Sequence, residues 1–400
     1  LYMSKTAMYL RIGTTYFKKS NFPTLTGDKI ETLIPWSPEL IRQDHGKDAL
    51  SKIEKFDGFI CYPENRPEHY LKMVEGYYNT YHQMSKKPVP GEIKNTMVFL
   101  KHIFGEQLEL GIDYLQILYL KPLQILPILC LVSKERATGK STFLKWMKEI
   151  FELNLTYITN DSFSSNFNAD WASKLLICVD EVLFQTEQLT ERIKYLSTTN
   201  VNKIEAKGKD RREIEFFGKF ILCSNNETSF IKIDPDEIRF WVRKINPYEK
   251  EDVYFLSKLL SEIPHFLNFL ANRKLSTENS SRMWFTREQI KTDALTNLIR
   301  HNCNKLETEL CNMLINIIEV LNVEVLDFTL SDLQNALNKF RIKYDATEIR
   351  RIIRKKWCLQ QQENPNKYEK VFVTQDLDIG FNPSKGRFYS ISRQFLLEKV

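Results

Sequence analysis

The chain has 400 residues, and its 57 Lys and Arg against 51 Asp and Glu give a formal net charge of +6. Apolar residues make up 42% and aromatic residues 12%, which is enough for a large core and excludes a wholly disordered or fibrous chain. At about 150 residues per domain, this length predicts two or three domains. The weak basic excess permits a polyanionic partner without requiring one, so the local clustering of charge matters more.

Residues 1–92 form a mixed α+β region. Its expected strands are Ala7–Ile12, Lys29–Leu33 and Phe59–Tyr62. The stretch Ser85–Gly91 is rich in Pro and Lys and reads as a linker, and a helical lead-in over residues 93–122 follows it, with helices at Thr96–Phe104 and Gly111–Leu120. The region has no obvious chemistry, and its place before the lead-in makes it an accessory segment or a collar between subunits.

From Pro127 short apolar runs alternate with helical patterns. Strands are expected at Ile128–Val132, Thr156–Thr159, Leu175–Val179 and Phe220–Cys223, and helices at Lys140–Phe151 and Gln188–Ser197. This alternation predicts an α/β core with a parallel sheet flanked by helices.

The sharpest motif is Ala137-Thr-Gly-Lys-Ser-Thr142, which follows an apolar strand and opens a helix, as a P-loop requires. Backbone amides of Ala137 to Thr142 would surround phosphates, with Lys140 beside the β- and γ-phosphates of ATP and the Ser141 hydroxyl on Mg²⁺. One departure stands out, because Lys134 occupies the position of the first glycine. A helix that merely begins with Gly139-Lys-Ser is the plain alternative.

Two further strands end in polar side chains. Leu175-Leu-Ile-Cys-Val-Asp-Glu181 supplies a carboxylate for a metal, Asp180, and a base for water, Glu181. Phe220-Ile-Leu-Cys-Ser-Asn-Asn226 places an amide where it could hold the attacking water. Asn225 is the preferred residue, Asn226 is the second choice, and a simple turn is the alternative.

A basic hairpin is expected between these two strands. Two alternating arms flank the tip Lys207-Gly-Lys-Asp-Arg-Arg212, and Gly208 permits the turn. The basic side chains Lys207, Lys209, Arg211 and Arg212 suit a phosphate backbone, although a solvated hairpin tip remains the alternative.

Farther along, Arg239 and Arg243 lie on the strand-like segment Ile238–Ile245. An arginine here could reach the γ-phosphate held by a neighbouring subunit. A structural salt bridge is equally plausible for either one.

Together these motifs resemble a superfamily-3 helicase, in particular the primase-helicase proteins of phages and bacterial mobile elements, over Asn95 to Arg273. The resemblance implies an AAA+-type ATPase core and a homo-oligomeric ring, usually a hexamer, that translocates on single-stranded DNA in the cytoplasm of a bacterial host. It further implies that Lys207 lies in a DNA-contacting hairpin and that Arg239 acts in trans. Because the chain opens at Leu1 and not at methionine, it is expected to be a piece of a longer polypeptide, and any primase module would lie upstream of Leu1.

The last hundred residues predict a winged-helix domain. Leu306–Leu321 reads as a helix, Ser331-x-x-Gln334 and Asp345-x-x-Glu348 as two capping boxes, and Glu369–Thr374 with Arg387–Ile391 as a β-ribbon. Ile349, Ile352, Ile353 and Trp357 form one apolar stripe, and the basic residues Arg350, Arg351, Arg354 and Lys355 lie off it. This arrangement is typical of a recognition helix for duplex or forked DNA, although it also fits an ordinary solvated face.

The predicted domains are therefore 1–92, 93–275 and 285–400, with the polar stretch Lys274–Ser281 as a second linker. The seven cysteines contain no C-x-x-C pair and the six histidines show no ligand spacing, so neither a zinc site nor a disulfide framework is expected, and the protein should be reduced and intracellular. No apolar run reaches the roughly 18 residues of a membrane span. Two rivals to the helicase remain: a replication initiator with a degenerate ATPase that acts through the winged helix, and an AAA+ machine that acts on protein.

Overall fold

The computed structural model describes residues 8–23, 29–165, 168–184, 186–205, 212–233, 237–248, 252–342 and 344–398. They form two compact units. The first contains the described residues of 1–231 and 236–295, and the second contains those of 232–235 and 296–400. The predicted N-terminal region and the predicted core thus lie within one unit.

The N-terminal part of the first unit is built from two small sheets. Its elements are β1 (Tyr9–Ile12), β2 (Thr15–Pro23), β3 (Lys29–Trp36), α1 (Pro38–His45), β4 (Glu54–Phe56), β5 (Phe59–Ile60), β6 (Met73–Val74) and β7 (Tyr77–Asn79). One sheet has the order β3-β2-β1-β4 and the other the order β5-β7-β6. Ser37 caps α1 by accepting a hydrogen bond from the Glu39 amide.

The central sheet has five strands in the order β14-β8-β13-β10-β9, and every pairing is parallel. The strands are β8 (Ile128–Val132), β9 (Leu155–Ile158), β10 (Leu176–Val179), β13 (Lys219–Ser224) and β14 (Phe240–Lys244). The predicted parallel sheet is therefore confirmed. β8, β10 and β13 are buried along their whole length, as expected for strands covered on both faces.

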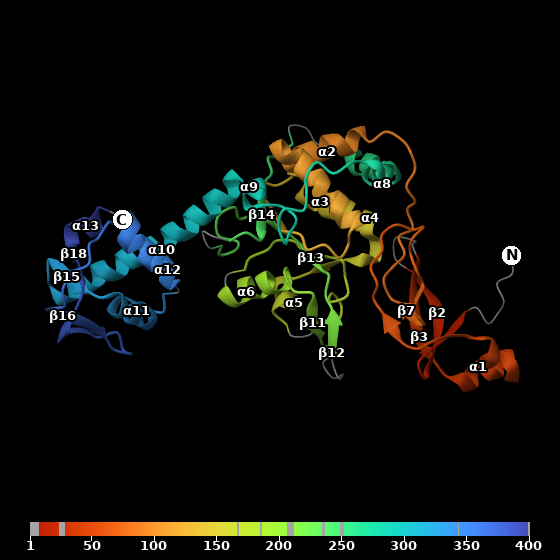
Figure 1. The fold of residues 1–400 in the computed structure, drawn as a ribbon, viewed down its shortest axis with the longest axis horizontal. Coiled ribbons are helices and arrows are strands. Elements are labelled where there is room, and N and C mark those ends of the chain that lie inside the picture. The colour runs from red at the N-terminus through yellow and green to blue at the C-terminus, as the bar shows by residue number, and fades with distance from the viewer. Residues whose placement is uncertain are drawn as a thin grey trace. The chain divides into compact units, whose positions relative to one another are not determined.

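Helices cover both faces of this sheet (Figure 1). They are α2 (Lys94–Phe104), α3 (Leu108–Leu120), α4 (Lys140–Phe151), α5 (Asn160–Ser164), α6 (Glu187–Leu196), α7 (Phe255–Ser261), α8 (Ile263–Asn272) and α9 (Arg287–Ile290). Ile221 and Cys223 of β13 pack into the core cluster with α2, α3, α4 and α8. Phe220, which points the other way, contacts Phe163 of α5.

The two predicted linkers are both attached to this unit. In the first, the Ser85 hydroxyl donates to Glu152 over 2.5 Å, and the Val89 amide donates to the Pro264 carbonyl over 3.0 Å. In the second, Ser276 and Thr277 donate from their amides and hydroxyls to the buried carboxylate of Asp113. The hydrogen bonds of the first linker join the N-terminal region to the core, and those of the second hold the segment after α8 against α3.

The two strands of the predicted hairpin are present. β11 (Val201–Ile204) pairs antiparallel with β12 (Arg212–Glu215), from Val201 opposite Glu215 to Ile204 opposite Arg212. Residues Lys207, Lys209 and Arg211 of the tip lie outside the described residues.

The second unit combines helices with two antiparallel strand pairs. Its elements are the C-terminal part of α10 (Asp293–Leu321), then β15 (Val325–Phe328), α11 (Leu330–Lys339), α12 (Ala346–Arg351) continued by a π-helical turn (Ile352–Lys356), β16 (Asn366–Val373), β17 (Ile379–Gly386), β18 (Tyr389–Ser392) and α13 (Arg393–Leu397). The predicted apolar stripe is buried, since Ile349, Ile352 and Ile353 are fully inaccessible and Trp357 nearly so. No helix among the described residues is long and apolar enough to span a bilayer.

Two predictions in this unit were wrong. The cap of α11 is Thr329 with Asp332, because the Thr329 hydroxyl accepts from the Asp332 amide and the Asp332 carboxylate accepts from the Thr329 amide; Ser331 and Gln334 lie inside the helix. The partner of β16 is β17, and residues 389–391 belong to β18, which pairs with β15. The Asn, Pro and Gly residues that read as turns lie in β17. Among the described strands β17 pairs with β16 alone, and such an edge strand tolerates Pro383.

Candidate active site

The carboxyl ends of β8, β10 and β13 bring the predicted polar residues to one edge of the sheet. β13 lies between β8 and β10, so Asn225 follows the strand that separates the loop after β8 from the acids after β10. The ends of parallel strands in an open sheet are where such proteins bind ligands.

The loop between β8 and α4 turns through two left-handed residues. Ala137 has φ 52° and Gly139 has φ 90°. A side chain at Gly139 would also meet the Tyr248 ring at 3.1 Å, so glycine is required there for both conformation and space. No side chain caps α4, and its first amides are therefore free of a capping partner that would compete with an anion.

Lys134 does not obstruct this geometry. It is exposed, and it is not among the described residues with positive φ, so a glycine is not needed at this position. Its backbone amide donates to Glu227 Oε1 over 3.0 Å. The departure from the usual P-loop pattern is thus accommodated by the chain after β13.

Lys140 lies beneath the loop and is 7% exposed. Its ammonium donates to the carbonyls of Ser133 and Glu135 over 3.4 and 3.5 Å and to the Thr138 hydroxyl over 3.2 Å. Burial lowers the pKa of Lys140, and the nearby carboxylate of Asp180 opposes this effect. Three long hydrogen bonds hold the ammonium loosely, and it forms no ion pair with any residue that the structure describes, so a phosphate would be a stronger partner.

Ser141 and Asp180 lie side by side, with Ser141 Oγ 3.4 Å from Asp180 Oδ2, and both are exposed. A hydroxyl and a carboxylate at this separation fit a Mg²⁺ ion, which takes oxygen ligands and completes its shell with water and substrate phosphate. The structure therefore fits the predicted metal residues. No cluster of three or more His, Cys, Asp and Glu side chains suited to a metal occurs in the described part of the chain.

Glu181 is exposed and has φ 55°, an unusual conformation for a residue with a side chain. Its carbonyl accepts from Asn160 Nδ2 over 3.2 Å, and the next amide, of Val182, donates to the Cys223 carbonyl over 2.8 Å. These contacts hold the turn in place. Strained backbone of this kind, which costs about 1–3 kcal/mol, is concentrated at functional sites.

The two asparagines after β13 differ in their contacts. Asn226 is committed to its own turn, since its Nδ2 donates to Ser229 Oγ and its Oδ1 accepts from the amides of Thr228 and Ser229. Asn225 is exposed, and no side-chain hydrogen bond is found for it among the described residues. The geometry favours Asn225 as the residue available to a ligand.

Glu227 is a site residue that the sequence reasoning missed. Besides the Lys134 amide it binds Lys244 Nζ over 3.1 Å, which joins the ends of β13 and β14 to the loop after β8. Burial raises the pKa of Glu227, but the Lys134 amide and the Lys244 ammonium outweigh burial and hold the pKa below its usual value. Its partners lie 93 and 17 residues away, and no local pattern signals such contacts.

His102 and Tyr248 were missed as well. Their rings stack at 4.0 Å with an interplanar angle of 14°. His102 Nε2 lies 3.0 Å from the Thr138 carbonyl, and Tyr248 packs against Gly139. Burial raises the pKa of Tyr248 to about 12. This aromatic pair supports the loop from the side of α2.

The two candidate arginines are not equivalent. Arg243 is 7% exposed at its side chain and donates to Glu106 over 2.6 Å and to Gln107 over 3.0 Å. Arg239 also forms an ion pair, with Glu237 at 2.7 Å, but 34% of its side chain remains exposed. Arg239 is thus the better placed of the two for a ligand on another molecule.

The four basic residues predicted for the recognition helix fall into two groups. Arg351 forms an ion pair with Glu348 at 2.6 Å, and Arg354 Nε donates to the Tyr389 hydroxyl over 2.8 Å. Arg350 and Lys355 are exposed, and no side-chain partner is found for either in the described parts of the chain. These two are the free cations of the predicted recognition helix.

A family model, described as a family of unknown function (DUF5906), matches residues 131–243. This stretch runs from the end of β8 to β14 and includes the loop, the acidic pair, Asn225 and both arginines. No curated protein matches the chain.

Solved structures match the chain along nearly its whole length. The apo structure of the NrS-1 C-terminal region (305–718) aligns with a TM-score of 0.58 at 17% identity, and the alignment covers 96% of this chain and 95% of that chain. The A form apo structure of the same region aligns with a TM-score of 0.57 at 17% identity, covering 95% and 94%. In its fold, the chain is therefore similar to the C-terminal region of NrS-1.

Proposed function

We propose that the protein is an ATP-dependent DNA helicase of the AAA+ class and superfamily 3, which acts as a ring on single-stranded DNA. The observation that carries this proposal is the meeting of Lys140, Ser141, Asp180, Glu181 and Asn225 at one sheet edge. The similarity in fold to the C-terminal region of NrS-1 supports it, as does the sequence resemblance to phage and mobile-element primase-helicase proteins.

In this proposal the amides of residues 137–142 and the Lys140 ammonium bind the phosphates of ATP. Ser141 and Asp180 would hold Mg²⁺, which neutralises charge on the β- and γ-phosphates. Glu181 accepts the proton of the attacking water, and the Asn225 amide orients that water. Glu181 has a left-handed backbone conformation and an exposed side chain, which leaves the carboxylate open to solvent and to a ligand.

Arg239 would act on the γ-phosphate held by a neighbouring protomer, where it offsets negative charge in the transition state. About a third of its side chain (34%) is exposed, which suits that role, and its ion pair with Glu237 would have to rearrange when a neighbour binds. Because ATP would bind between subunits, its hydrolysis would change the subunit interface and so move the β11–β12 hairpin. Basic residues at the tip of this hairpin would grip the DNA backbone without reading its sequence.

The second unit has the order of elements proposed for a winged helix, with α11 and α12 followed by the β16–β17 hairpin. Its basic residues Arg350 and Lys355 would bind duplex DNA near the ring.

The test is ATP turnover with and without single-stranded DNA, in the wild type and in Lys140→Ala. The proposal predicts turnover that DNA stimulates and that Lys140→Ala abolishes. DNA binding with no turnover would identify an initiator with a degenerate ATPase, and turnover indifferent to DNA would identify an AAA+ machine acting on protein. Either result contradicts the helicase.

A further inference from the structure

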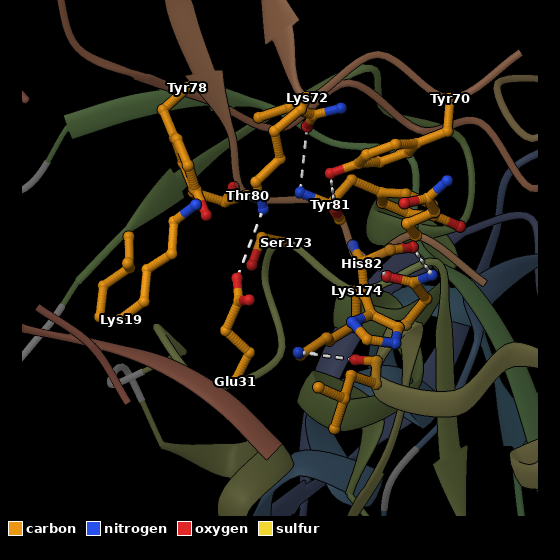
Figure 2. A pocket seen from close by; sticks show the side chains of 15 residues that line it. Lys19, Glu31, Tyr70, Lys72, Tyr78, Thr80, Tyr81, His82, Ser173 and Lys174 are labelled. Atoms are coloured by element: carbon orange, nitrogen blue, oxygen red, sulfur yellow. Dashed lines mark hydrogen bonds and ion pairs between the residues drawn. The ribbon is translucent and has the colours of Figure 1, made fainter. Parts of the chain in front are cut away.

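A groove of about 640 Å³ opens at the amino ends of β9 and β10, opposite the carboxyl ends that carry the candidate active site. Figure 2 shows the side chains that line it. Asn154 and Lys174, which precede β9 and β10, form one wall. Lys19 of β2 and Glu31 of β3 form the facing wall, and the segment from Tyr78 to Gln83 forms the floor. The groove therefore joins the N-terminal sheets to the core within the first unit.

Positive charge dominates the lining, which contains three lysines and one glutamate. Lys72 Nζ lies 3.7 Å from Glu31 Oε1, and both side chains are about half exposed. Lys174 Nζ donates to the Leu153 carbonyl over 2.7 Å. Among the described residues, neither Lys19 nor Lys174 has a carboxylate within ion-pair distance. A polyanion would supply the negative charge that the lining lacks.

The floor of the groove is preorganised. Asn154 Oδ1 accepts from the His82 amide and Asn154 Nδ2 donates to the His82 carbonyl, both within 2.9 Å. The Tyr70 hydroxyl donates to the Tyr81 carbonyl over 2.9 Å. These inward hydrogen bonds fix the polar floor. The Lys19 and Lys72 side chains are the groups that can rearrange around a ligand, whereas Lys174 is held by the Leu153 carbonyl.

Aromatic rings accompany the lysines. Lys72 Nζ lies over the Tyr78 ring, 4.3 Å from its centroid, and Tyr70 is half buried in the same lining. A positively charged groove is one of the features that proteins use to hold the backbone of single-stranded nucleic acid. Tyr78 is 4% exposed, so its ring supports Lys72 and does not offer a face to a base. An exposed ammonium on a ring is held by about 0.5–1 kcal/mol, so a phosphate can attract it away at little cost.

A second cavity of about 610 Å³ shares Thr80 and Ser173 with this groove and reaches Glu213, Ile214 and Glu215 of hairpin arm β12. The groove thus adjoins the hairpin proposed to grip DNA. The two glutamates disfavour a phosphate backbone in the second cavity. Contacts with a polyanion are therefore confined to the lysine-lined groove.

We propose that this groove binds the backbone of single-stranded nucleic acid, as a second contact beside the β11–β12 hairpin, through Lys19, Lys72 and Lys174. The proposal extends the DNA-binding role proposed above and rests on it. Glu31 would act against binding, both by its own charge and by holding Lys72.

The test is the affinity of the full chain for a fluorescently labelled oligothymidine, measured by anisotropy at several salt concentrations. The double variant Lys19→Ala/Lys72→Ala should lose about tenfold in affinity, and the slope of log K against log salt should fall by about 1.4, or 0.7 for each lost phosphate contact. Glu31→Gln should bind more tightly than the wild type. The matched control is Lys18→Ala, because Lys18 is the neighbour of Lys19 on the other face of β2 and lies 4.6 Å over the Trp36 ring.

The proposal would be overturned if the double variant and Lys18→Ala had the same affinity and the same salt slope. It would also be overturned if the double variant lost affinity for duplex DNA only. The single variant Lys19→Ala keeps the test decisive if the double variant does not fold. Lys19 is half-buried and forms no ion pair among the described residues, so its removal should leave the fold intact. DNA-free ATP turnover is the second readout and should be unchanged in these variants. Absence of turnover in the wild type would contradict the helicase, whereas the affinity series would still decide the groove.

Discussion

The Ser141 hydroxyl and the Asp180 carboxylate lie 3.4 Å apart although 39 residues separate them in sequence. The contact exists because β8 and β10 run parallel in one sheet with only β13 between them, so that the loop after one faces the end of the other. A hydroxyl and a carboxylate presented together beside a buried lysine form a charge pattern suited to a metal-bound triphosphate.

Glu181→Gln should retain ATP but lose hydrolysis, because the amide cannot accept the proton of water. Turnover is expected to fall by about 10²–10⁴-fold, the range for removal of a general base. Binding of a fluorescent ATP analogue and phosphate release are the two measurements. Turnover at the wild-type rate would overturn the role of Glu181, and Glu135→Gln, at an exposed residue of the loop, is the control.

Arg239→Ala should be inactive alone and should recover part of its turnover when mixed with Lys140→Ala, if Arg239 serves a neighbour's site. Mixed rings would then contain some boundaries with an intact Lys140 on one side and an intact Arg239 on the other. Phosphate release from the mixtures is the measurement. Activity that does not exceed the sum of the two variants would leave Arg239 with a role in its own subunit.

Lys219 should make stability depend on pH. The residue is buried, its ammonium donates to the carbonyls of Pro122 and Phe217, and burial lowers its pKa to about 7. Between pH 7 and an unfolded pKa near 10.4, the unfolded chain binds a proton that the folded chain lacks, so the free energy of unfolding rises with pH, by at most about 1.4 kcal/mol per unit. Below pH 7 both states are protonated and this dependence disappears.

Urea unfolding of the wild type and of Lys219→Met at pH 7, 8 and 9 measures this effect. The difference in stability between the two should move in favour of the wild type as the pH rises. The control is Lys145→Met, at an exposed position of α4. Its free energy of unfolding should change with pH in the same way as that of the wild type. If the free energy of unfolding of Lys219→Met also changed with pH as that of the wild type does, Lys219 would be shown to stay charged in the folded protein.

Arg350→Ala/Lys355→Ala should weaken binding of duplex DNA. The slope of log K against log salt should fall by about 1.8, since each lost phosphate contact in duplex DNA contributes about 0.9. Arg351→Ala is the matched comparison, because its guanidinium is bound to Glu348. That variant should lose some stability with little change in DNA affinity. If Arg351→Ala lowered DNA affinity as much as the double variant does, Arg350 and Lys355 would not be the residues that bind DNA.

Local patterns predicted much of the sheet and its helices. The strand β8 and the helix α4 have the predicted bounds, because a fully apolar run and a glycine-opened amphipathic run both carry strong local signals. The cap of α11 was misplaced by two residues, since Thr329 and Ser331 both suit a helix start and only the Asp332 contact decides between them. The Pro and Asn of β17 resembled a turn although pairing with β16 keeps them extended.

The support around the site could not be predicted in the same way. Glu227 reaches Lys134 across 93 residues, and the lysine groove joins segments from Lys19 to Lys174. Such contacts depend on strand order, which a single sequence does not reveal through its periodicity. The candidate residues themselves were recognisable because each follows directly on an apolar strand.

A structure of the protein with Mg²⁺ and a non-hydrolysable ATP analogue would show whether the loop between β8 and α4 binds a nucleotide. We expect the triphosphate against the amides of residues 137–142, with Lys140 Nζ turned from the Ser133 and Glu135 carbonyls to a phosphate and with Ser141 and Asp180 beside the ion. A nucleotide bound elsewhere, or a loop that keeps all three Lys140 contacts and excludes the phosphates, would contradict this expectation.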